Sequence, residues 1–115
     1  MKGNNIGFNH AINGILVTVK TERNLRIHLV IALIVIITGF VFNLSQLEWL
    51  FIIVAIASVI VTELINSIIE RLIDYLKPEI NLQAKEIKDM SAGIVLFTCF
   101  ISVIIGLVIF LPKIY

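Results

Sequence analysis

Four polar residues, Glu63, Asn66, Glu70 and Asp74, fall on one face of a single predicted helix. Their spacing places them within roughly 80° of the helix circumference, because successive residues turn by about 100°. They directly follow a strongly apolar run, Trp49 to Val61. A charge near the bilayer centre costs on the order of 2.5–3.5 kcal/mol, so three aligned acids and an amide at the end of a membrane helix indicate a function. The simplest such function is the binding of a hydrated cation such as Mg²⁺.

Glu63 lies where the apolar run meets the predicted cytoplasmic interface. Taken alone, it would be interpreted as an interfacial acid reaching for water. With Asn66 and Glu70 on the same face, we favour a carboxylate that acts as a general base.

Two carboxylates are candidate ligands of Mg²⁺, which commonly takes one or two carboxylates together with nucleotide phosphates. Glu70 belongs to the acidic face, and Glu22 precedes the first apolar segment. Lys88 and Asp89 precede the last apolar segment, where a lysine can bind phosphate and an aspartate can hold a ribose or orient the lysine. The sequence contains no GxxxxGK[ST], GxGxxG or protein-kinase motif, so a nucleotide site must be built on another scaffold.

Simpler interpretations stay open at several of these positions. Glu22 can be an exposed charge beside Arg23, and Asp74 can belong to a solvated helix face. Lys88 can be an interfacial anchor. His28 is interpreted as an interfacial residue rather than a ligand.

These side chains must be positioned by membrane helices. Hydrophobic residues make up 59% of the chain and charged residues 15%, a composition that is rare in a small soluble domain. We predict an all-α integral membrane protein with one domain over residues 1–115 and three transmembrane helices at about 26–44, 47–75 and 89–111. The second helix includes a cytoplasmic extension that carries the acidic face, and Pro78 is expected to end it.

Residues 6–21 or so predict an amphipathic helix on the cytoplasmic membrane surface. Its apolar stripe consists of Phe8, Ile12, Ile15, Leu16 and Val19. A flexible tail is the alternative, because Gly14 weakens the helix.

The basic residues predict the orientation. Eight of the nine lysines and arginines lie before the first span or between the second and third spans, and only Lys113 follows the third. By the positive-inside rule the N-terminus is cytoplasmic and the C-terminus lies outside. A net charge of +1 gives no reason to expect nucleic acid as a partner, and the single cysteine, Cys99, cannot form an internal disulfide.

Thr98, Ser102 and Gly106 recur every four residues in the third span. Small residues at this spacing let membrane helices pack closely. We therefore expect this face to meet another helix, of the same or a neighbouring subunit.

The sequence at 63–70, ELINSIIE, followed by Asp74 and by the Lys-Asp pair at 88–89, resembles the prokaryotic diacylglycerol kinase family. The stretch ERNLRIH at 22–28 fits the same family, and the resemblance extends over about residues 8–111. Members of this family are small lipid kinases of the bacterial plasma membrane.

The resemblance implies a homotrimer with active sites shared between neighbouring subunits, using MgATP. It implies that Glu63 is the general base that takes the proton of the lipid hydroxyl, and that Asn66 helps to arrange Glu63 and the phosphates. Glu22 and Glu70 would hold Mg²⁺ on the nucleotide. The full set of implied nucleotide contacts is Glu22, Glu70, Glu79, Lys88 and Asp89.

The family has two substrate branches, one phosphorylating diacylglycerol and the other undecaprenol. The stretch at 22–28 resembles the second branch, so we expect an undecaprenol kinase, with diacylglycerol as the alternative lipid. A small membrane transporter or an assembly subunit is the non-enzymatic alternative. Transporters place the acid in the middle of a span, whereas here every acid except Glu48 lies on the predicted cytoplasmic side.

Overall fold

Four helices and short connections make up the protein. The computed structural model describes residues 4–77, 79 and 81–115, and all the regular secondary structure among these residues is helical. The helices are α1 (Asn4–Thr21), α2 (Arg23–Val41), α3 (Gln46–Leu76) and α4 (Leu82–Ile114). Pro78, the predicted end of the long helix, and Lys2, one of the basic residues on the predicted inner side, lie outside the described residues.

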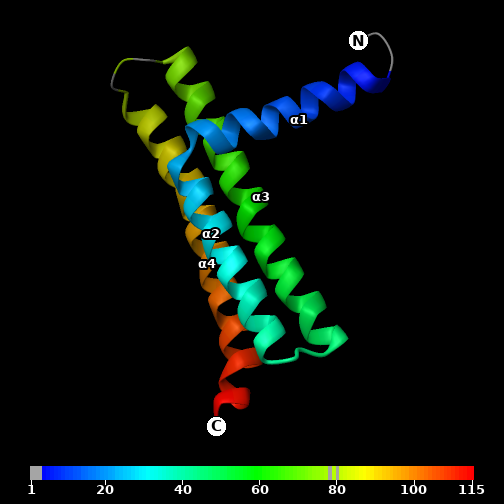
Figure 1. Ribbon diagram of the computed structural model, residues 1–115. Helices are drawn as coiled ribbons and strands as arrows, with labels where there is room; N and C mark the ends of the chain where they lie inside the picture. The colour runs from blue at the N-terminus through cyan, green and yellow to red at the C-terminus, as the bar shows by residue number, and fades with distance from the viewer. Residues whose placement is uncertain (1–3, 78, 80) are drawn as a thin grey trace.

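The helices α2, α3 and α4 run side by side as an antiparallel bundle, and α1 leaves it at a steep angle (Figure 1). The end from which α1 projects is also the end where α3 and α4 are connected, while the C-terminus lies at the opposite end. The three bundle helices are each long and apolar enough to cross a membrane. The prediction of an all-helical protein with three apolar spans is therefore confirmed.

Most apolar side chains of the bundle face outward. Three spans can bury only a narrow seam between them, so residues such as Val30, Leu96 and Phe97 stay exposed. In a bilayer these side chains meet lipid tails, which are as apolar as the side chains themselves. The exposed apolar surface is thus expected of a membrane bundle.

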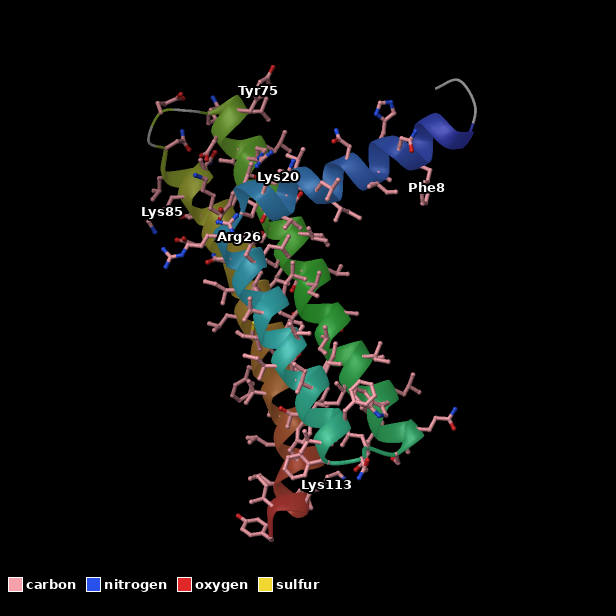
Figure 2. All side chains as sticks on the ribbon, viewed as in Figure 1. Phe8, Lys20, Arg26, Tyr75, Lys85 and Lys113 are labelled. Atoms are coloured by element: carbon pink, nitrogen blue, oxygen red, sulfur yellow. The ribbon has the colours of Figure 1, made fainter. Side chains whose placement is uncertain are left out.

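The helix α1 spans 18 residues and ends with Lys20 in its last turn. Phe8 is 67% exposed, and Figure 2 shows its side chain on the side of α1 toward which the bundle extends. Ile12, Ile15 and Leu16 are exposed as well. The helix itself agrees with the sequence, and its contact with the membrane surface stays a prediction.

A single non-helical residue, Glu22, separates α1 from α2. Its backbone is extended, with φ −108° and ψ 107°, and this redirects the chain. The Arg26 guanidinium donates to the backbone carbonyls of Val19 (2.9 Å) and Lys20 (2.8 Å). These carbonyls are in the last turn of α1, where helices leave acceptors free and favour cations. Arg26 thus fixes the corner that carries Glu22.

The turn between α2 and α3 is closed by a capping box. The Ser45 side chain accepts from the Glu48 backbone N–H (3.2 Å), and the Glu48 carboxylate accepts from the Ser45 N–H (2.9 Å). Close to this turn Gly39 packs against the Trp49 ring, where an added Cβ would come within 2.6 Å of ring carbon. The missing side chain lets α2 approach α3, and Leu44, Ile52 and Ile109 form the core there.

The helices α3 and α4 make the most extensive pairing in the bundle. The Ser102 hydroxyl donates to the Ala55 carbonyl at 3.2 Å, so the small-residue face of the third span meets another helix of this chain at Ser102, whereas an added Cβ at Gly106 would meet nothing within 4 Å. The helix α4 begins at Leu82, several residues before the predicted span, because the Asn81 side chain caps it by accepting from the Ala84 N–H (3.0 Å). At 31 residues, α3 is about 46 Å long and outruns a bilayer core of about 30 Å.

Candidate active site

The acidic face of α3 passes from the interior of the bundle to its surface. Glu63 is 3% exposed and Asn66 is 6% exposed. Glu70 is half-buried, and Asp74 is exposed. The predicted face is therefore one row of side chains that starts inside the bundle and ends near the connection between α3 and α4.

Glu63 meets a side chain of α2. Its Oε2 atom lies 3.4 Å from Nε2 of His28, and the two side chains are 5% and 21% exposed. The helix α2 brings His28 to this depth because Leu25, one turn earlier, is buried at 2% exposure and Ala32, one turn later, at 8%. A carboxylate thus sits among apolar helices with an imidazole beside it.

Asn66 and Glu70 are the next two residues of this row along α3. The Asn66 amide donates to Oε1 of Glu70 at 3.4 Å. The Asn66 Oδ1 atom and the hydroxyl of Ser67 are both buried and lack a hydrogen-bond partner within the described part of the chain. Buried polar atoms normally have partners, so these two oxygens indicate that a ligand, water or a second subunit completes this region.

Glu22 reaches α3 from the corner between α1 and α2. Its Oε2 atom lies 3.2 Å from Nη2 of Arg71, and the same nitrogen donates to the Thr21 hydroxyl at 2.7 Å. Since Arg71 directly follows Glu70, this contact brings the two predicted Mg²⁺ ligands to the same end of the bundle.

Two of the three remaining predicted nucleotide contacts, Lys88 and Asp89, are paired with neighbouring charges. Lys88 is paired with Asp74, which ties α4 to the exposed end of the acidic row. Asp89 is paired with Lys85 at 2.6 Å. Glu79 is exposed in the connection between α3 and α4. Their predicted role toward ATP stays a prediction.

The predicted Mg²⁺ fits the oxygens offered by the row together with Glu22, which comes from the corner between α1 and α2. Glu22 and Glu70 offer carboxylates, and Asn66 Oδ1, which has no hydrogen-bond partner among the described residues, is a third hard oxygen. No three acidic, histidine or cysteine side chains gather into a metal-binding group among residues 4–77, 79 and 81–115. One or two carboxylates are the usual protein contribution where phosphates and waters fill the other positions of Mg²⁺.

An apolar groove lies between α2, α3 and α4 and is lined at one end by His28, the neighbour of Glu63. Its volume is about 290 Å³. His28 lines one end, Phe110 lies near the other, and Cys99 and Ser102 are among the residues between. The groove therefore joins the polar row to the middle of the bundle.

Three residues of this region were not predicted as site residues. His28 was interpreted as interfacial, Ser67 was noted only within the family motif, and Arg71 was counted only as a basic residue. Ser67 could have been found from the helix period, since it lies four residues after Glu63. His28 and Arg71 carry no local signal, because their partners belong to other helices.

The charged groups also distinguish the two ends of the bundle. Lys20, Arg26 and Lys85 lie at the end that carries the acidic row, and Lys113 lies at the opposite end (Figure 2). There Lys113 pairs with Glu48 at 3.1 Å. The basic asymmetry read from the sequence is therefore an asymmetry of the folded molecule.

Comparison with known proteins agrees with this architecture. The family model for prokaryotic diacylglycerol kinase matches residues 9–110. The chain is also 43% identical over 106 residues to the undecaprenol kinase of Bacillus subtilis (strain 168), covering 92% of this chain and 86% of that protein. These matches confirm the resemblance drawn from the motifs: the chain belongs to the prokaryotic diacylglycerol kinase family.

Proposed function

We propose that this protein is an integral membrane kinase that transfers the γ-phosphate of ATP to the hydroxyl of undecaprenol. One observation carries the proposal: Glu63 is a carboxylate buried at 3% exposure, in line with Asn66 and Glu70 and beside His28, which lines an apolar groove. The printed activity of the 43% identical relative supports the choice of lipid.

Glu63 acts as the general base in this proposal. It takes the proton of the lipid hydroxyl while the hydroxyl oxygen bonds to the γ-phosphorus, and the bond from that phosphorus to the bridging oxygen breaks to release ADP. Because the site is shielded from bulk water, the lipid hydroxyl can lie within hydrogen-bond distance of the carboxylate without water competing for that position. Asn66, one turn along α3, arranges Glu63 and the phosphates.

The nucleotide is placed along the exposed half of the row. Glu22 and Glu70 hold Mg²⁺, which when bound neutralises charge on the phosphates. Glu79, Lys88 and Asp89 contact the nucleotide, so Lys88 and Asp89 exchange their present partners, Asp74 and Lys85, for ATP. Three of these four side chains are exposed and Lys88 is half-buried, and ion pairs near the surface are worth only about 0–1 kcal/mol, so the exchange costs little.

The lipid stays in the membrane during the reaction. Its hydroxyl sits at Glu63, and its isoprenoid chain extends along the apolar groove toward Phe110. Apolar walls discriminate weakly, by roughly 1–3 kcal/mol for a methylene-sized difference. We therefore expect diacylglycerol to be used as well, but more slowly.

The active-site end of the bundle faces the cytoplasm, because ATP is cytosolic and the basic residues favour that side. The N-terminus is then inside and the C-terminus outside, in the plasma membrane of a bacterium. The helix α1 lies on the inner membrane surface with its exposed apolar side chains in the lipid.

The functional unit is a homotrimer with sites completed between subunits. The unpartnered oxygens of Asn66 and Ser67 support this, since a single subunit leaves them without a hydrogen bond among its described residues. The thin bundle, with most of its apolar surface exposed, also leaves room for a neighbour.

Competition between the two lipids tests the substrate. Purified protein in mixed micelles receives γ-labelled ATP, Mg²⁺, undecaprenol and diacylglycerol together, and the label in each lipid gives the ratio of kcat/KM. Preference for undecaprenol supports the proposal, and a tenfold preference for diacylglycerol would show that the branch is wrong while leaving a lipid kinase. No label in either lipid would favour a transporter or an assembly subunit.

A further inference from the structure

The Glu63 carboxylate has one polar neighbour of note, and it comes from another helix. His28 Nε2 lies 3.4 Å from Glu63 Oε2. Within the described part of the chain, no other group donates a hydrogen bond to this carboxylate. Leu25 and Ala32, on the turns of α2 before and after His28, are buried, and so is Glu63 itself.

We propose that His28 is the positioning residue for Glu63. The Nε2 atom holds Oε2, so that the second oxygen, Oε1, is left to face the lipid hydroxyl. A glutamate side chain has several rotatable bonds, and one held contact at its end removes most of the orientations that point the carboxylate away from its task. This role rests on the proposed function, because it assumes that Glu63 is the base.

The position of His28 in the groove gives the contact a second consequence. The imidazole lines the apolar groove, and Glu63 lies beside it, outside the groove's lining. Any chain that fills the groove therefore passes the edge of the ring before its hydroxyl meets the carboxylate. His28 thus sets both the direction of the base and the depth at which the acceptor oxygen stops.

The reach of the side chain at position 28 provides the test. In glutamine the amide nitrogen can occupy about the place of Nε2, whereas in asparagine it falls short by one methylene. We compare His28→Gln, His28→Asn and His28→Leu in the full-length protein, measuring kcat and the KM values for MgATP and for undecaprenol. The same Gln and Asn pair at His10, an exposed histidine of α1, is the matched control.

We expect His28→Gln to keep kcat within about threefold of the wild type, and His28→Asn and His28→Leu to lose about 10–100-fold, since a misplacement of about 1 Å at a reacting group costs up to 10²-fold. The KM for MgATP should stay unchanged in all three variants, because the nucleotide lies along the other half of the row. At His10 the Gln and Asn variants should give equal values.

Equal kcat values for His28→Gln and His28→Asn, whether both normal or both low, would overturn the proposal. A purely structural role predicts that equality, because both amides would fill the space in similar ways. If His28→Leu does not fold, as shown by lost binding of MgATP, the comparison of the two amides still decides the matter. Activity retained by Glu63→Gln would instead remove Glu63 as the base, whereas an inactive Glu63→Gln with equal amide variants would remove only the role of His28.

Discussion

Replacing Glu63 by glutamine removes the proposed base and little else. The amide has nearly the volume of the carboxylate, so the packing around this 3% exposed side chain should be kept. The amide oxygen can still accept from His28 Nε2, which now lies 3.4 Å from Oε2. The variant should therefore fold and bind MgATP as the wild type does, and the change should appear in the chemical step.

The size of the loss follows from the burial of the site. General-base catalysis contributes about 10²–10⁴-fold to a rate. This corresponds to about 2.7–5.5 kcal/mol of activation free energy, at 1.36 kcal/mol for each factor of ten. Because Glu63 is buried among apolar helices, bulk water is a poor substitute for it, and we expect a loss toward the upper part of this range.

The assay follows transfer of the labelled γ-phosphate from ATP to undecaprenol in mixed micelles, with kcat and both KM values determined. Glu86→Gln is the control, since Glu86 is an exposed acid of α4 outside the row, and it should retain full activity. Retention of more than about a third of the wild-type kcat by Glu63→Gln would refute the reasoning, because that loss is far below what removal of a base produces.

Three further predictions concern the metal, the orientation and the stability. Glu22→Gln and Glu70→Gln should each raise the Mg²⁺ concentration needed for half-maximal activity, and a Mg²⁺ dependence equal to that of Glu86→Gln would exclude both as ligands. For the orientation, single cysteines are introduced at position 45 or 83 in a Cys99→Ala background. An impermeant maleimide added outside the cell should modify the cysteine at position 45 and spare the one at position 83. The reverse labelling pattern would place the acidic row on the side of the membrane without ATP. Ser45→Ala should lower the free energy of unfolding in micelles by about 0.5–2 kcal/mol, because it removes one half of the capping box. Ser58→Ala, whose hydroxyl only bonds to the Val54 carbonyl of its own helix, should cost less, and equal losses would mean that the cap adds nothing.

Sequence alone was enough for the membrane class, the three apolar helices and the family. These features depend on local properties: the length of each apolar run, the 3.6-residue period and the spacing of the motif. The period also placed Glu63, Asn66 and Glu70 on one face of α3 before any contact was known. The burial gradient along that face followed from its position at the end of an apolar run.

Tertiary structure decided which side chains meet across helices. The Glu22–Arg71 contact joins residues 49 positions apart, and the Lys88–Asp74 pair joins residues 14 apart on two different helices. The approach of His28 to Glu63 depends on how closely α2 packs against α3. Close packing of these two helices is possible because Gly39 has no side chain that would clash with the Trp49 ring. A helix period specifies which face a residue occupies, but the register and distance between two helices follow from the side chains that interdigitate between them. That is why His28, interpreted from the sequence as an interfacial residue, is found next to Glu63 only in the folded bundle.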